Sequence, residues 1–162
     1  MNPRFAAPAS LSNHRPVSGR LYSVGYEGLE VEALVDHLAF AKVSLVVDVR
    51  LNPVSRRRGY SRKTLTAALH AAGIEYRHEP DLGNPPDNRD SFRRGDGEEG
   101  RRRMREILEN GSAPALGRLV ECARNARVAV LCVERERLRC HRDVITDAVK
   151  EADPNIEVRQ IL

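Results

Sequence analysis

Short apolar runs alternate along this chain with stretches of helical periodicity. The predicted strands cover residues 20–25, 44–49, 74–78, 128–132 and 156–162. The predicted helices cover residues 30–42, 64–72, 101–109, 115–124 and 141–152. Near-continuous apolar runs are typical of parallel strands covered on both faces, and alternation with helices predicts right-handed crossovers. We therefore expect an α/β fold with a mostly parallel, Rossmann-like sheet of about five strands and helices on both faces.

Two segments lack this periodicity. Residues 1–19 have no apolar pattern and are expected to form a disordered leader, so residues 20–162 form the single predicted domain. Residues 80–100 are rich in Pro, Gly and charge, which predicts a long loop. Loops of this length in small domains are usually functional lids or disordered segments.

The composition is typical of a soluble globular protein, with 41% hydrophobic residues. No apolar run approaches the roughly 20 residues that span a bilayer, and the first residues lack a secretory signal, so we expect no membrane partner and a cytoplasmic location. Three cysteines without CxxC spacing (Cys122, Cys132 and Cys140) predict reduced thiols rather than a disulfide framework.

The chain is basic, with a net charge of +4, and all but three of its 27 Lys and Arg residues are Arg. Arginine binds phosphate and carboxylate in a planar, bidentate way, so a polyanion-binding face is one interpretation and genomic codon bias is the other. The absence of Trp and an aromatic content of 4% count against base stacking.

The richest chemistry lies between Val128 and Ala148. Cys132 ends a predicted strand, Glu134 follows in the loop, and Cys140-His141-Arg142 opens a predicted helix. A helix N-terminus and neighbouring cations bind anions and stabilise a thiolate. Cys140 is therefore predicted to be a reactive thiol or part of an anion clamp, and the alternative is a cysteine packed beneath the helix.

Cys132 is the weaker candidate for a nucleophile. The residues that follow it, V-E-R-E-R-L-R, contain no glycine and are too bulky to cradle an anion with backbone amides. A buried cysteine is commonly a small apolar residue.

Other predicted strands also end in polar residues. Asp48 and Arg50 lie on the same side of their strand, where they could pair or face the crevice together. Ser55 and Arg56 belong to a basic turn suited to a phosphate or carboxylate, and His78 is a candidate general base.

Other motif searches narrow the chemistry. His78, Cys132, Glu134, Cys140 and His141 are possible metal ligands by type, but no HExxH or CxxC spacing connects them, so no metal site is assigned and no cofactor is predicted. The chain has no GxGxxG after the first strand, no Walker loop and no GxSxG elbow, which excludes those nicotinamide, ATP-hydrolase and serine-hydrolase signatures.

Six motifs in one order resemble the family called domain of unknown function 488. They are V-G-Y at 24–26, V-D-V-R at 47–50 with Pro53, Ser55 and Arg56, Y-S-x-K at 60–63, G-I-E-Y-R-H with L-G at 73–83, L-C-V-E at 131–134 and C-H-R at 140–142. The resemblance covers about residues 20–162. It implies a compact α/β domain found mainly in bacteria.

The resemblance also implies recurrent polar positions. They fall on Asp48, Arg50, Ser55, Arg56, His78, Cys132, Glu134, Cys140, His141 and Arg142. Tyr26 stands where relatives commonly have a His, and the region after Gly83 is shorter and richer in Arg than usual.

Three functions remain open. The first is a small enzyme that acts on an anionic, phosphorylated or nucleotide-like substrate, in which Arg50, Arg56 and Arg142 hold the anion. Cys140 or Cys132 would then react, His141 or His78 would move protons, and Glu134, Asp48, Ser55 and Tyr26 would assist or orient them. The second is a nucleic-acid or nucleotide binding module that uses the arginines of 56–58, 93–94 and 101–105. The third is a metal-dependent enzyme.

Overall fold

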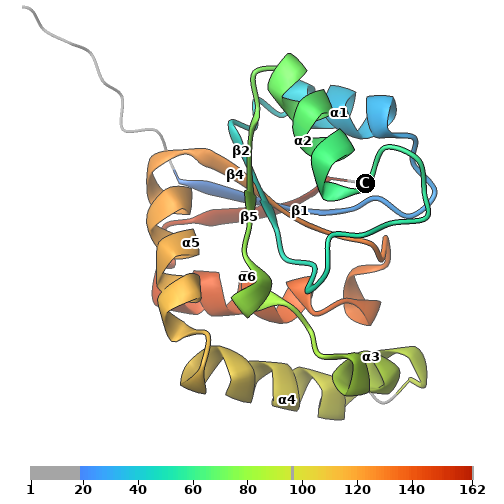
Figure 1. The fold of residues 1–162 in the computed structure, drawn as a ribbon. Helices are drawn as coiled ribbons and strands as arrows, with labels where there is room; N and C mark the ends of the chain where they lie inside the picture. The colour runs from blue at the N-terminus through green and yellow to red at the C-terminus, as the bar shows by residue number, and fades with distance from the viewer. Residues whose placement is uncertain (1–18, 96, 162) are drawn as a thin grey trace, which may run out of the picture.

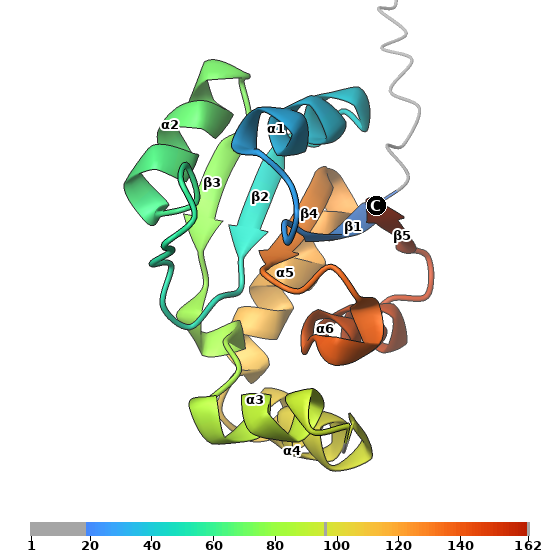
Figure 2. The same ribbon diagram turned by 90° about the vertical axis from the view of Figure 1, so that its right-hand side faces the viewer.

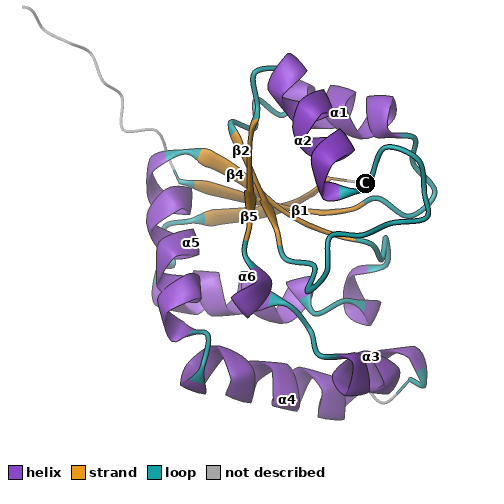
Figure 3. Ribbon diagram, viewed as in Figure 1, coloured by secondary structure: helices purple, strands orange, loops and turns teal. Residues whose placement is uncertain are grey.

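The computed structural model describes residues 19–95 and 97–161 as an α/β fold with one parallel sheet (Figures 1 and 3). The strands are β1 (Arg20–Gly25), β2 (Leu45–Asp48), β3 (Glu75–His78), β4 (Arg127–Cys132) and β5 (Glu157–Ile161). Their order in the sheet is β3-β2-β4-β1-β5, and every neighbouring pair is parallel. The predicted fold class is confirmed, and each predicted strand is present with ends that shift by at most one residue.

Helices cover both faces of the sheet. Helices α1 (Val31–Phe40) and α2 (Arg62–Ala71) lie on one face, and α5 (Ala113–Asn125) and α6 (Arg142–Ala152) lie on the other (Figure 2). The apolar stripes of these helices bury residues such as Leu34, Leu65, Leu119 and Ile145. Each predicted helix outside 80–110 is present with bounds that differ by two residues or fewer.

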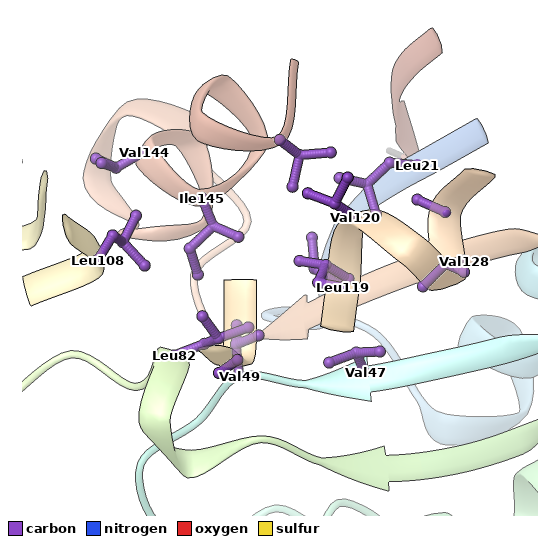
Figure 4. Close-up of a cluster of buried hydrophobic side chains, with 14 of the residues drawn as sticks. Leu21, Val47, Val49, Leu82, Leu108, Leu119, Val120, Val128, Val144 and Ile145 are labelled. Atoms are coloured by element: carbon purple, nitrogen blue, oxygen red, sulfur yellow. The ribbon is translucent and has the colours of Figure 1, made fainter. Parts of the chain in front are cut away.

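Alternate side chains of the central strands enter two separate cores. Val128, Val130 and Cys132 of β4 pack with α5 and α6, whereas Ala129 and Leu131 pack with α1 and α2 (Figure 4 shows the first core). Because side chains of a strand alternate between faces, a strand covered on both faces must be apolar at every position. The same alternation places the Cys132 side chain on the face of the sheet that α6 covers.

The prediction of a long loop at 80–100 is wrong. This segment holds a 3₁₀ turn, η1 (Pro80–Leu82), then α3 (Pro86–Arg93) and the start of α4 (Gly97–Asn110). The buried positions of α3 and α4 have a narrow, four-residue spacing and include few large apolar residues: Asn88, Phe92, Gly100, Met104 and Leu108. Such a thin stripe gives a weak periodic signal, and α3 and α4 are stabilised by packing on each other. The predicted leader lies, except for Gly19, outside the described residues.

The topology creates a crevice at the carboxyl edge of the sheet. The chain leaves β2 for β3 in one direction, whereas it leaves β4 for β5 in the other. The crossovers after two neighbouring strands therefore diverge, which is the arrangement at which open α/β sheets bind ligands. Helices α3 and α4 lie beyond this edge (Figure 2). None of the described helices is both long and apolar enough to cross a membrane.

Candidate functional site

A pocket with a volume of about 160 Å³, here called the strand-end pocket, opens at the carboxyl ends of β2 and β4. The segment after β2, helix α3 and the segment after β4 form its walls. Its polar lining residues are Arg50, Asn52, Asn84, Arg89, Arg93, Cys132, Glu134, Arg139, Cys140 and His141. Ligand pockets for drug-sized molecules usually exceed about 300 Å³, so this pocket suits a small molecule or the terminal group of a larger one.

Cys132, Cys140 and His141 meet inside this pocket and are here called the thiol–imidazole cluster. Their ligand atoms, two Sγ and one ring nitrogen, all lie within 4.8 Å of one another. His141 Nδ1 lies 3.7 Å from Cys140 Sγ and 4.0 Å from Cys132 Sγ. At 3.0 Å, His141 Nε2 donates to the carbonyl oxygen of Val49, because a carbonyl can only accept. Nδ1, the other ring nitrogen, therefore faces the two sulfur atoms.

Arg142 supports the cluster from within the protein. Its side chain is 1% exposed, and its Nε donates to Cys140 Sγ at 3.2 Å. Its Nη1 donates to Ser23 Oγ at 3.1 Å, and its Nη2 donates to the carbonyl oxygen of Glu134. Arg142 thus holds the Cys140 sulfur and the β4 loop rather than lining the pocket, where the sequence placed it as an anion holder.

The two thiols of the cluster ionise differently. Burial opposes ionisation of Cys140, but the hydrogen bond from Cys132 and the His141 and Arg142 charges outweigh it and hold the pKa of Cys140 well below its usual range. The hydrogen bond to Cys140 and burial raise the pKa of Cys132 well above its usual range. Cys140 is therefore the more easily ionised of the two thiols.

Glu134 joins the cluster from the loop after β4. Its Oε2 accepts from Cys132 Sγ at 3.3 Å, and burial, followed by the proximity of Cys140, raises the pKa of its carboxyl. The Glu134 backbone lies against Gly25, where a Cβ atom would stand 1.9 Å from the Glu134 carbonyl oxygen. A glycine at the end of β1 is therefore required for this close approach.

Asp48 and Arg50 form a buried ion pair beside the pocket. Asp48 Oδ2 accepts from Arg50 Nη2 at 2.5 Å and from the Tyr76 hydroxyl at 2.6 Å. Arg50 Nη1 also donates to the Tyr26 hydroxyl, and the Tyr26 ring stacks on Tyr60 with centroids 3.9 Å apart. Asp48 and Tyr26 are thus structural partners of Arg50, and Arg50 presents only part of its surface to the pocket.

The remaining sequence-predicted residues lie apart from the thiols. His78 Nε2 donates to the Arg50 carbonyl at 2.8 Å and does not line the pocket. Ser55 Oγ accepts from the Arg57 backbone, and Arg56 is exposed outside the pocket. The geometry therefore places neither His78 nor Arg56 in contact with the cluster.

Sequence reasoning did not predict that the segment 84–93, which holds α3, forms a wall of the pocket, and it named Arg93 only as part of a nucleic-acid binding face. Asn84, Arg89, Phe92 and Arg93 line the pocket, and so does Arg139 from the turn before Cys140. The Arg89 Nε donates to the Asn84 carbonyl at 3.0 Å. Because residues 80–100 were predicted to be a loop, no helix was expected to line the pocket. The Pro-Pro-Asp sequence at 85–87 is a helix-start signal that could have indicated α3.

These features define a class: an α/β protein with a buried thiol–imidazole cluster at the switch point of a parallel sheet. A family model described as domain of unknown function DUF488 matches residues 30–149. The chain belongs to this family, and the resemblance seen in the sequence motifs is confirmed. Neither the comparison with curated proteins nor the comparison with solved structures found a match.

Proposed function

We propose that this protein is a thiol-dependent enzyme that acts on a small anionic substrate in the strand-end pocket. The observation that carries the proposal is the place of Cys140, a buried residue of the pocket lining whose Sγ accepts a hydrogen bond from the buried Arg142 guanidinium. His141 Nδ1 lies 3.7 Å from the same sulfur, a distance that suits a cysteine–histidine pair.

Arginines favour an anion as the substrate. Arg89 and Arg93 of α3 and Arg139 of η2 (Arg137–Arg139) line the pocket. Arg139 pairs with Glu136, but Arg89 and Arg93 form no salt bridge with any carboxylate of the described residues. Guanidinium groups of this kind recognise phosphate and carboxylate, and the pocket volume of about 160 Å³ favours one small phosphorylated group.

The residues present support a two-step substitution. In the first step, the Cys140 sulfur attacks the electrophilic atom of the substrate, an S–X bond forms, and the bond from X to the leaving oxygen breaks. Glu134, which contacts Cys132, gives its proton to that leaving oxygen. In the second step, water attacks X, returns a proton to Glu134 and releases the Cys140 thiolate.

The test uses alkylation of Cys140 by iodoacetamide in the presence of a chelator, followed by peptide mass spectrometry. Inorganic phosphate and nucleoside monophosphates should protect Cys140. Arg89→Ala and Arg93→Ala should each raise the concentration needed for protection by about 10- to 100-fold, because a charge-assisted hydrogen bond contributes about 1.5–3 kcal/mol. Conversion of a panel of phosphate monoesters should be lost in Cys140→Ser.

Arg56→Ala is the matched control, since Arg56 is an exposed arginine outside the pocket. This variant should retain protection by phosphate at the wild-type concentration. The proposed function would be refuted by two results together: the alkylation rate of Cys140 is the same in the presence and absence of each anion, and Cys140→Ser still converts the phosphate monoesters.

A further inference from the structure

We propose that the thiol–imidazole cluster is also a binding site for a single zinc-class metal ion. Cys132, Cys140 and His141 supply two sulfurs and one imidazole nitrogen, the donor set that Zn²⁺ prefers. The ion and the substitution chemistry use the same Cys140 sulfur, so the metal-bound and free-thiol forms are alternative states of one site.

The separations between the donor atoms fit one ion. A tetrahedral Zn²⁺ with bonds of about 2.3 Å to sulfur and about 2.0 Å to nitrogen places sulfur and nitrogen roughly 3.5 Å apart. His141 Nδ1 lies 3.7 Å from Cys140 Sγ and 4.0 Å from Cys132 Sγ. A contraction of a few tenths of an ångström therefore brings the imidazole nitrogen to the required distance from each sulfur, and the two sulfur atoms lie within 4.8 Å of each other.

The surroundings orient the imidazole for ligation. The hydrogen bond from His141 Nε2 to the Val49 carbonyl fixes the ring and leaves Nδ1 as the ligand atom. A backbone carbonyl is one of the usual partners of the second ring nitrogen of a metal-bound histidine, together with carboxylates and water. The hydrogen bond from Arg142 Nε to Cys140 Sγ likewise fixes the sulfur.

The charges of the site also balance. In the metal-bound form, two thiolates offset the divalent cation. An ionised Glu134, which contacts Cys132, then offsets the Arg142 guanidinium, which contacts Cys140. Burial of Cys132, Cys140 and His141 makes this compensation important, because an uncompensated charge in a buried site is costly.

The fourth coordination position faces the strand-end pocket, which all three donor residues line. Glu134 approaches Cys132 but does not belong to the group of atoms within 4.8 Å. Three protein ligands and one open position characterise a zinc ion that can bind water or substrate. Oxygen-preferring ions such as Mg²⁺ and Ca²⁺ should not compete for this site.

The experiment measures binding of Zn²⁺ to the reduced full-length protein by competition with a chromophoric chelator, and Co²⁺ is used as a spectroscopic probe. We expect one ion per chain and sulfur-to-cobalt charge-transfer absorption. Cys132→Ser and His141→Gln should each weaken binding more than about 100-fold, because loss of an outer-shell partner alone costs up to that factor. Cys122→Ser is the matched control, since Cys122 lies on α5 outside the cluster, and should bind as the wild type does.

A second readout needs no variant of the cluster. Zinc should protect Cys132 and Cys140 of the wild type from alkylation and leave Cys122 reactive. Binding that is equal in the wild type and Cys132→Ser, or zinc that fails to protect either cysteine, would overturn the metal site. Neither result would contradict the proposed function, because protection of Cys140 by phosphate is measured in the presence of a chelator, without bound metal.

Discussion

Individual ion pairs of this protein are expected to differ widely in their contribution to stability, because some are buried and others are exposed to water. Asp48 is fully buried and Arg50 is 4% exposed, and their pair connects β2 to the two stacked tyrosines. Arg102 of α4, by contrast, is 58% exposed where it pairs with Glu99 and Glu106. Removing one partner from a buried pair leaves an uncompensated charge, whereas water screens an exposed pair.

Arg50→Met should therefore lower the free energy of unfolding by about 3–5 kcal/mol, since Asp48 is left buried without its cation. Arg102→Met should lower it by less than about 1 kcal/mol. Urea denaturation of both variants measures the difference. Equal losses would show that Asp48 and Arg50 do not form the buried pair described above.

Stability at high pH depends on buried tyrosines. Burial raises the pKa of Tyr60 to about 12, and burial together with the hydrogen bond to Asp48 raises the pKa of Tyr76 above its usual value. A tyrosine ionises near pH 10 in the unfolded chain. Because its folded pKa is higher, the contribution of Tyr60 to stability is complete below pH 10 and is lost between pH 10 and about pH 12.

The midpoint of thermal unfolding should accordingly fall as the pH rises through this range. Tyr60→Phe should show a shallower fall than the wild type, since phenylalanine has no proton to lose, although its midpoint at pH 8 should be lower because the hydrogen bond to the Leu29 carbonyl is lost. Parallel curves for the two proteins would contradict the assignment to Tyr60.

At the scale of elements, the site depends on how closely the end of β1 meets the loop after β4. The Tyr26 and Glu27 amides donate to the Cys132 and Val133 carbonyls, and this contact leaves no room for a side chain on Gly25. The same loop supplies the Glu134 carbonyl to Arg142. The β1 end therefore helps to position the Arg142 guanidinium on the Cys140 sulfur.

Gly25→Ala should lower the free energy of unfolding by at least about 1–3 kcal/mol, as overpacking of a filled interior does. It should also change the rate of Cys140 alkylation, because the Glu134 backbone must move. Gly117→Ala is the control: Gly117 lies in α5 with open space at its Cβ position, and alanine there should stabilise the helix by up to about 1 kcal/mol. A wild-type alkylation rate and stability in Gly25→Ala would disprove the role of the close contact.

At the scale of the whole molecule, the high arginine content does not give α4 a strongly positive surface. This helix has four arginines and four glutamates. Arg101, Arg102, Arg103 and Arg105 each pair with a carboxylate, in some cases on another helix. Arg101, for example, reaches Asp143 and Asp147 of α6. The pairs that reach α3 and α6 hold α4 against these helices, and all of the pairs reduce the positive potential available to a polyanion.

We therefore expect oligonucleotides to bind only weakly at physiological salt. Fluorescence anisotropy with labelled single- and double-stranded DNA, measured across a salt series, provides the test. Tight binding that weakens steeply with salt would contradict this expectation and would favour the nucleic-acid binding module.

Much of the fold could be predicted from the chain, and the missing part has a physical cause. Strands β2 and β4 are apolar at nearly every position because helices cover both sides, and that pattern is visible in the sequence. Helix α3 was missed because only Asn88 and Phe92 are buried along it. Its stability depends on α4, a contact that no local pattern reports.

For the candidate site, too, some features follow from the sequence and others only from the tertiary structure. The sequence by itself determined that polar residues end β2 and β4 and that Cys140-His141-Arg142 begins a helix, because strand and helix signals are local. Only the tertiary structure decided their roles: it brought Cys132 beside Cys140, turned Arg142 inward to the Cys140 sulfur, and placed Arg89 and Arg93 in the pocket wall. It also kept His78 away from the thiols. These outcomes depend on how the loop after β4 folds back and on how α3 packs at the sheet edge, which strand and helix signals do not report.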